Sequence, residues 1–403
     1  MEMIQTRVMR HLKVLSSEIG VRPIGAISNH EASSYIENIF KSSGINIETQ
    51  QFEIPCWENI EASLTIYGHL RKVTSNIFSP SVDVTAEVVP LCTIDELASS
   101  QLDGKIAVLY GELAKENFTA KGFTIYNPEH HKQIIHLLEQ KNPAAVITVN
   151  LHTHTDLPLI SDWDFGIPSV TISPEDALLL IGTNAPPSVH LKIHSKRTLG
   201  HTKNVIGRKE GSRNEKIIMS AHYDSVFGSP GAFDNASGVA VLLTLVEELS
   251  QRGFKTGFEF VAFGSEEYLG IGDRVYINKH KDELRAAIAA LNFDGVGQIL
   301  GTNTVTLMAG SSQLEDELRR IKSSFPSVHW TNPWYDSNHF TFFSNGVPSI
   351  PIRSTGVTDL IHTKNDEWHW ISPSKLAEVV TLAIQMIEML QDKRVDWSRE
   401  AKS

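Results

Sequence analysis

Short apolar runs alternate with stretches of helical periodicity in the second half of the chain. The segments 216–221, 257–263 and 286–293 are apolar and of strand length. Between the first two, apolar residues recur at helical spacing from Val239 to Leu249, until Gly253 ends the pattern. Strands that alternate with helices imply crossover connections and a mostly parallel sheet. The pattern therefore predicts an α/β fold, with a mostly parallel mixed sheet flanked by helices.

Histidine and carboxylate side chains follow these apolar runs or the loops between them. They are His222, Asp224, Asp234, Glu266, Glu267, Asp294 and, ahead of a final amphipathic helix over 376–390, His362. In open parallel sheets, ligands bind outside the carboxyl ends of the strands. Zinc accepts mixed imidazole and carboxylate ligands. The order of these residues therefore indicates a dizinc hydrolase site.

Asp224 has an expected role of its own. The period of two along a strand sends His222 and Asp224 to the same side. A carboxylate beside a metal-binding histidine usually accepts the second ring N–H and fixes the orientation of the ring. We therefore expect His222 to be a metal ligand and Asp224 to orient it.

From about Asn204 to Leu390 the sequence resembles the family of co-catalytic dizinc aminopeptidases that includes aminopeptidase Y and the secreted bacterial leucyl aminopeptidases. The resemblance implies a zinc-peptidase, phosphorylase/hydrolase-like fold and two Zn2+ per chain, with Co2+ or Mn2+ as substitutes. It implies these roles: His222 and Asp294 would hold one ion, Glu267 and His362 the other, Asp234 would bridge them, and Glu266 would be the general base. The peptide bond between Asp234 and Asn235 would be cis.

One position departs from the family pattern. Several relatives carry Tyr directly before the last metal-binding histidine, where its hydroxyl can stabilise the tetrahedral intermediate, and this chain has Ile361. The segment 335–342 resembles the family's Ser-Asp-His segment, with Asn338 where Asp is usual. Tyr335 and His339 are therefore candidate oxyanion donors, and packing alone is the alternative explanation for both.

The middle of the chain has a different composition. Between about Trp57 and His194, short β-like runs alternate with turns and the site motifs are absent. The segments 104–109, 142–147 and 165–172 resemble the protease-associated domain found in several of these peptidases. We expect a discontinuous peptidase domain, 1–56 with 195–403, and an inserted β-rich α+β domain over 57–194. The pair His152 and His154 within it is interpreted as a polar loop rather than a further metal site.

Composition restricts the class of protein further. The chain has 403 residues, 41% hydrophobic and 21% charged, which suffices for two or more cores. The net charge of -11 argues against a nucleic-acid partner. No apolar run approaches the roughly 20 residues that cross a bilayer, and the segment 1–19 lacks the apolar core of a secretory signal. We therefore predict a cytoplasmic protein without a membrane partner. Cys56 and Cys92 do not indicate a disulfide framework.

The predicted substrate is a peptide with a free N-terminus. Trp330, Trp334, Tyr335, Trp368 and Trp370 fall in two loops that should border the metals, which favours a neutral or hydrophobic N-terminal residue. A metal-dependent amidohydrolase or carboxypeptidase stays open as an alternative, with Arg353 as the cation for a substrate carboxylate. So does a non-catalytic, receptor-like binding scaffold. Exposed edges of the inserted domain would permit a homo-oligomer.

Overall fold

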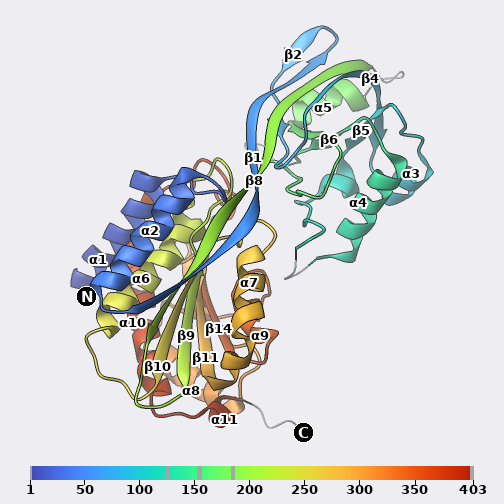
Figure 1. Cartoon of the computed structure of the whole chain (residues 1–403). Helices are drawn as coiled ribbons and strands as arrows, with labels where there is room; N and C mark the ends of the chain where they lie inside the picture. Colours follow the sequence, from blue (N-terminus) through green and yellow to red (C-terminus); the bar gives the residue numbers. More distant parts are fainter. Residues whose placement is uncertain (1, 124–126, 152–156, 183–186, 400–403) are drawn as a thin grey trace. The chain divides into compact units, whose positions relative to one another are not determined.

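The computed structural model divides the chain into two compact units (Figure 1). Residues 2–123, 127–151, 157–182 and 187–399 are described, so the pair His152 and His154 lies outside the described residues. The first unit comprises Met1–Ile54 and His201–Ser403, and the second comprises Pro55–Gly200. Two long strands, β1 (Asn46–Ile66) and β8 (Ser188–Lys209), contribute residues to both units.

A mixed sheet forms the centre of the first unit. Its strand order is β13-β12-β14-β11-β9-β10-β8, with these bounds: β9 (Lys216–His222), β10 (Gly257–Phe263), β11 (Ala287–Phe293), β12 (Thr302–Val305), β13 (His329–Trp330) and β14 (Ser349–Thr355). The four central strands β14, β11, β9 and β10 are parallel, while β8 and β12 run antiparallel to their neighbours β10 and β14. The predicted fold class, a mostly parallel mixed sheet between helices, is confirmed.

Helices cover both faces of this sheet (Figure 1). One face packs against α1 (Glu2–Lys13), α2 (Ile27–Ser42), α6 (Ser237–Leu249), α8 (Ser312–Ser323) and α10 (Pro373–Leu390). The other face packs against α7 (Ile271–His280), η4 (Lys281–Ala286) and α9 (His339–Phe343). Because side chains alternate along a strand, Met219 of β9 enters the first core and Ile218 the second. This burial on both faces explains why the central strands are continuous apolar runs.

Shorter elements complete the first unit. A π-helical turn, η1 (Val14–Ile19), continues α1, and a second, η3 (Ala232–Ala236), precedes α6. A short 3-10 turn, η5 (Trp368–Trp370), and the final helix α11 (Val395–Ser398) lie near the end of the chain. Gly238, in the first turn of α6, permits a close approach to β11, because a Cβ there would lie 2.2 Å from the carbonyl oxygen of Phe293. The segment that carries Asp234 is thereby held against the end of β11.

The second unit contains its own sheet and cores. Strands β4 (Val82–Leu91), β5 (Ile106–Leu109), β6 (Ala145–Val149) and β7 (Ser169–Ile172) are parallel, and β3 (Thr74–Ser75) and the first part of β8 pair antiparallel at the two ends. Beside them lie β2 (His69–Arg71), α3 (Ile94–Ser99), η2 (Gly111–Ala114), α4 (Glu129–Lys141) and α5 (Pro174–Ile181). Cys56 and Cys92 are both free thiols. The assignment of this unit to a protease-associated domain stays a prediction.

Helix length and polarity also bear on the membrane question. In the described part of the chain, every helix is too short or too polar to cross a bilayer.

Candidate metal centre

Three parallel strands present the site residues at their carboxyl ends. His222 is the last residue of β9, Glu266 and Glu267 follow β10, and Asp294 follows β11. The strands are in register, with His222 opposite Phe263, so their ends lie at one edge of the sheet. The backbone N–H of Asp294 donates to the carbonyl oxygen of Ile352 (3.1 Å), which anchors this residue to β14.

Asp234 lies between the two imidazoles. Its Oδ1 is 3.2 Å from Nε2 of His222, and its Oδ2 is 3.2 Å from Nε2 of His362. The same His222 nitrogen is 3.4 Å from Oδ1 of Asp294, and the His362 nitrogen is 3.2 Å from Oε2 of Glu267. The two oxygens of one carboxylate therefore face two different histidines, each with a carboxylate partner of its own. The peptide bond after Asp234 is cis, as the family resemblance implies.

His362 has an unusual backbone conformation. Its φ is 65°, in the left-handed region that non-glycine residues seldom occupy. The residue lies in a loop before η5, and its side chain is 36% exposed, whereas that of His222 is 1% exposed. Strained backbone of this kind concentrates at functional sites, where surrounding structure holds it.

Asp224 holds the backbone of the carboxylate pair. Its Oδ1 accepts the N–H of Glu266 and its Oδ2 accepts the N–H of Glu267, both at 3.1 Å. The expected contact with His222 is weaker, because the acceptor nearest to Nδ1 of that ring is the backbone carbonyl oxygen of Asp224 (3.2 Å), with Oδ1 at 3.5 Å. Asp224 therefore orients His222 through its backbone and orients Glu266 and Glu267 through its side chain.

Asp366 holds the backbone at Asp234 in place, and the sequence did not indicate this role. Its Oδ1 accepts the N–H of Phe233 (2.7 Å) and its Oδ2 accepts the N–H of Asp234 (3.0 Å). The side chain of Asn235 then ties this segment to β11, because its Nδ2 donates to the carbonyl oxygen of Phe293 (2.8 Å). The position of Asp366, four residues after His362, is the sequence signal that could have identified it.

Arg22 is a second residue that the sequence did not reveal. Its side chain is completely buried. It donates to five backbone carbonyl oxygens: those of Leu15 (2.9 Å), Gly20 (2.7 Å), Tyr223 (2.9 Å), Pro230 (2.6 Å) and Gly231 (3.0 Å). Tyr223 directly follows His222, and Gly231 lies three residues before Asp234. One guanidinium therefore holds both the segment with His222 and the segment with Asp234 in place. All five acceptors are neutral, and the carboxylates of Asp366, Asp224, Glu267 and Asp234 partly offset the lowering of the Arg22 pKa by burial.

The carboxylates and imidazoles of the site shift one another's pKa values strongly. Burial raises the pKa of Glu267 to about 7 and raises that of Glu266 well above its usual range, with neighbouring carboxylates adding to both shifts. Burial lowers the pKa of His222, but Asp294 and Glu266 reverse this and leave it well above its ordinary value. Burial opposes ionisation of Asp234, yet its contacts with the two histidines lower its pKa. Such perturbed groups in one cluster are typical of a functional site.

The donor set fits divalent metal ions. Oxygen and nitrogen atoms of His222, Asp234 and Glu267 converge within 4.8 Å of one another. Oε1 of Glu267 is buried without a hydrogen-bonding partner in the described structure, and four carboxylates crowd together, so the site needs positive charge. Imidazole and carboxylate ligands in this ratio suit zinc. The residues present therefore fit a metal ion at this place.

A pocket of about 350 Å³ adjoins Asp234 and Asp294. Its other walls include Phe233, Trp334, Asp336, Arg353 and Ile361. Of the four tryptophans expected at the site, only Trp334 belongs to this lining. Trp330 instead packs under the guanidinium of Arg319, and Trp368 under the ammonium of Lys13.

The two candidate oxyanion donors are placed differently from each other. Tyr335 is 46% exposed, packs against Phe340 and Phe343, and is not among the pocket residues. His339 is buried, its Nε2–H donates to the carbonyl oxygen of Trp334 (2.7 Å), and burial lowers its pKa to about 4. In this neutral tautomer Nδ1 has only a lone pair, so the ring has no free N–H for an oxyanion. The geometry favours packing roles for both, and their catalytic role stays untested.

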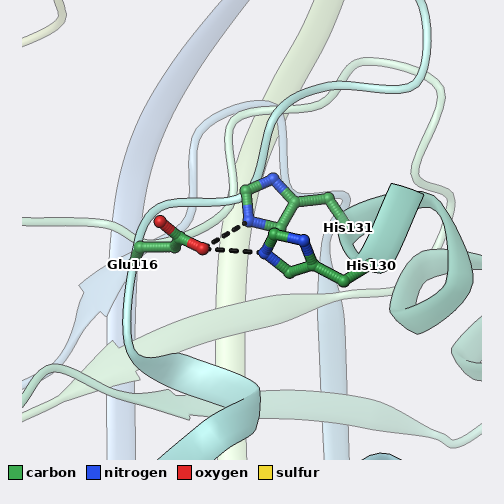
Figure 2. A group of neighbouring side chains, drawn as sticks. All are labelled: Glu116, His130 and His131. Carbon is green, nitrogen blue, oxygen red and sulfur yellow. Dashed lines mark hydrogen bonds and ion pairs between the residues drawn. The ribbon is translucent and has the colours of Figure 1, made fainter. Parts of the chain in front are cut away.

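A second cluster lies in the other unit, where Glu116 approaches His130 and His131 (Figure 2). Oε1 of Glu116 is 2.7 Å from Nε2 of His130 and 3.4 Å from Nε2 of His131. Nδ1 of His131 accepts the backbone N–H of Thr119 (3.1 Å). The neutral ring therefore carries its proton on Nε2, which faces the carboxylate and is not available to a metal ion. We interpret this cluster as a hydrogen-bonded network.

The fold and the site together define a class, the hydrolases with a co-catalytic metal centre at the carboxyl ends of a mixed sheet. Residues 204–387 match peptidase family M28. Aminopeptidase YwaD of Bacillus subtilis (strain 168) is 27% identical over 401 residues, which cover 92% of this chain and 82% of that protein. The probable leucine aminopeptidase 2 of Aspergillus oryzae (strain ATCC 42149 / RIB 40) is 25% identical, over 81% of this chain and 68% of its own length.

Solved structures agree with this result. An aminopeptidase from Aneurinibacillus sp. strain AM-1 matches with a TM-score of 0.76 and 25% identity, covering 99% of this chain and 95% of its own. BSAP, a zinc aminopeptidase from Bacillus subtilis, shares the fold with a TM-score of 0.77 at 23% identity, covering 98% of both chains. The match of residues 204–387 to peptidase family M28 and the similarity to these aminopeptidases show that the chain is a peptide hydrolase.

Proposed function

We propose that the protein is a zinc-dependent aminopeptidase that uses two zinc ions. The observation that carries the proposal is the position of Asp234, whose two carboxylate oxygens each lie 3.2 Å from a different imidazole. A single shared carboxylate between two ligand sets is the arrangement that a two-metal hydrolase needs. The relatives named as aminopeptidases support the exopeptidase assignment.

The proposed ligand sets follow the contacts. His222 and Asp294 would hold one ion, His362 and Glu267 the other, and Asp234 both. When bound, two zinc ions polarise the scissile carbonyl and lower the pKa of water.

Glu266 is the proposed general base. Its Oε2 is 4.0 Å from Nε2 of His222, farther than the carboxylates of Asp234 and Asp294, so it lies beside the ligand set rather than within it. It would accept a proton from the attacking water and return it to the leaving amine. Asp224 would keep it in place through the backbone N–H that it accepts.

The pocket supports the expected preference for a neutral or hydrophobic N-terminal residue. Phe233, Trp334 and Ile361 give it apolar walls next to Asp234 and Asp294. Apolar walls with a few placed polar groups are typical of substrate pockets. The carboxylates of Asp234 and Asp294 in its lining would attract the ammonium of a free N-terminus, which an aminopeptidase must bind and an amidohydrolase need not.

Hydrolysis of aminoacyl-p-nitroanilides tests the proposal. We expect release from free-amine substrates only, loss of activity on chelation, and recovery with zinc. Glu266→Gln should bind zinc normally and lose at least about 100-fold in kcat. Glu315→Gln, on the exposed face of α8, is the matched control. Equal cleavage of N-acetylated substrates would move the assignment to the amidohydrolase alternative, and normal turnover by Glu266→Gln would remove Glu266 from the mechanism.

A further inference from the structure

Arg353 lies at the edge of the candidate active site, and no described residue forms a hydrogen bond or an ion pair with its guanidinium. It lies in β14, is half-buried, and lines the pocket that Asp234 and Asp294 also line. Within the described ranges 2–123, 127–151, 157–182 and 187–399, its guanidinium makes neither a hydrogen bond nor an ion pair, and Asp336 and Asp294 act on it only at longer range. Five N–H donors are therefore left for a ligand.

The guanidinium packs over a tryptophan ring. Its Cζ lies 4.3 Å from the centre of the Trp334 ring. Trp334 is itself held, because its carbonyl oxygen accepts from His339 (2.7 Å) and the two rings pack edge to face with centroids 4.3 Å apart. A cation–π contact of this kind does not use the N–H donors in hydrogen bonds, so they stay available to a ligand. The cation is thus held in position before any ligand arrives.

The surroundings select the kind of ligand. A planar fork of N–H donors matches a carboxylate, which it binds through two parallel hydrogen bonds. Phe233, Trp334 and Ile361 line the same pocket and would contact an apolar stem of the ligand. Burial strengthens such a pairing, because a half-buried charge without a partner is costly.

We propose that Arg353 binds a carboxylate of the substrate, so that the enzyme favours peptides with a carboxylate close to the scissile bond. The inference rests on the proposed aminopeptidase function and names the substrate class for the same site. The carboxylate has two possible sources, an acidic N-terminal side chain or the C-terminus of a dipeptide. The second source is compatible with a neutral or hydrophobic N-terminal residue.

Paired substrates separate the two sources. Leu-Gly and Leu-Gly-amide differ only in the terminal carboxylate, and Glu-p-nitroanilide and Gln-p-nitroanilide differ only in the side-chain carboxylate. For zinc-loaded protein we expect kcat/KM to be higher for the carboxylate member of one pair. Arg353→Gln should lower the ratio of kcat/KM for the carboxylate member to kcat/KM for its neutral partner by about 10- to 100-fold, because it removes a charge-assisted hydrogen-bonded pair. Arg353→Lys, which keeps the charge but not the fork, should retain part of the preference.

Arg319→Gln is the matched control. Arg319 also stacks on a tryptophan, with Cζ 4.1 Å from the centre of Trp330, but it is already paired with Glu315 and lies outside the pocket. It should leave both ratios unchanged. Ratios near one for both pairs, or ratios that Arg353→Gln does not move, would overturn the inference and leave the aminopeptidase function intact. Absence of turnover on all four substrates and on leucine p-nitroanilide would instead overturn the proposed function and, with it, the basis of the inference.

Discussion

Arg22→Met tests whether one buried guanidinium holds the metal-binding segments together. The substitution removes all five hydrogen bonds to backbone carbonyl oxygens. At about 1.5 kcal/mol for each bond from a charged donor, the loss is about 7 kcal/mol. Burial lowers the pKa of Arg22 from 12.5 to about 10, so the buried charge itself costs about 3 kcal/mol, which methionine does not incur. The net destabilisation is therefore about 4 kcal/mol.

Thermal unfolding of the metal-free protein is the assay. A loss of about 4 kcal/mol should lower Tm by about 10 °C. The carbonyl groups of Tyr223 and Gly231 also lose their anchor, so zinc affinity of the folded variant should fall by about 10- to 100-fold. Arg320→Met is the control, because Arg320 is exposed on α8, where it forms a surface ion pair with Glu317. A Tm within about 3 °C of wild type would refute the reasoning, and unchanged zinc affinity at a lowered Tm would limit Arg22 to a structural role.

Two further predictions concern buried carboxylates. Asp366→Asn replaces one acceptor oxygen by an NH2 group that faces the N–H of Phe233 or Asp234. In a zinc titration we therefore expect the zinc affinity to fall by about 10- to 100-fold. An unchanged affinity would show that Asp234 does not need the support of Asp366. Burial raises the pKa of Asp273 from 3.8 to about 6. Between these two pH values the folded protein keeps the Asp273 proton while the unfolded chain loses it, so the free energy of unfolding falls as pH rises, by about 3 kcal/mol in total. Asp273→Asn removes this pH dependence, and its amide can donate to Oδ1 of Asn338, which has no hydrogen-bonding partner in the described residues. The Tm of the wild type should therefore fall relative to that of the variant between pH 4 and 6. Parallel Tm profiles would contradict the raised pKa of Asp273.

The sequence predicts the central sheet and its active edge because the signals are local. Strands β9, β10 and β11 are buried on both faces, so each is a largely apolar run, and the polar site residues lie at its last position or soon after it. Parallel topology then requires those ends to meet at one edge. The predicted ligand candidates follow from this rule and from the family resemblance, without knowledge of any distance.

The supporting residues could not be predicted in this way. Arg22 binds the carbonyl groups of Pro230 and Gly231, which lie more than 200 positions away in sequence. Every residue has a backbone carbonyl group, so the residue types at these positions do not indicate the contact. Asp224 is predicted from the sequence as a partner of His222, but the bonds from its carboxylate to backbone N–H groups 42 and 43 positions away are not. The long strands β1 and β8 were also missed, because many of their residues are exposed and the apolar pattern is interrupted.

Anomalous diffraction at the zinc edge from crystals of the zinc-loaded protein tests whether Asp234 bridges two metal ions. We expect two peaks about 3.5–4 Å apart, one on each side of Asp234. One peak should contact His222 and Asp294, and the other His362 and Glu267. A single peak, or two peaks that do not share Asp234, would contradict it.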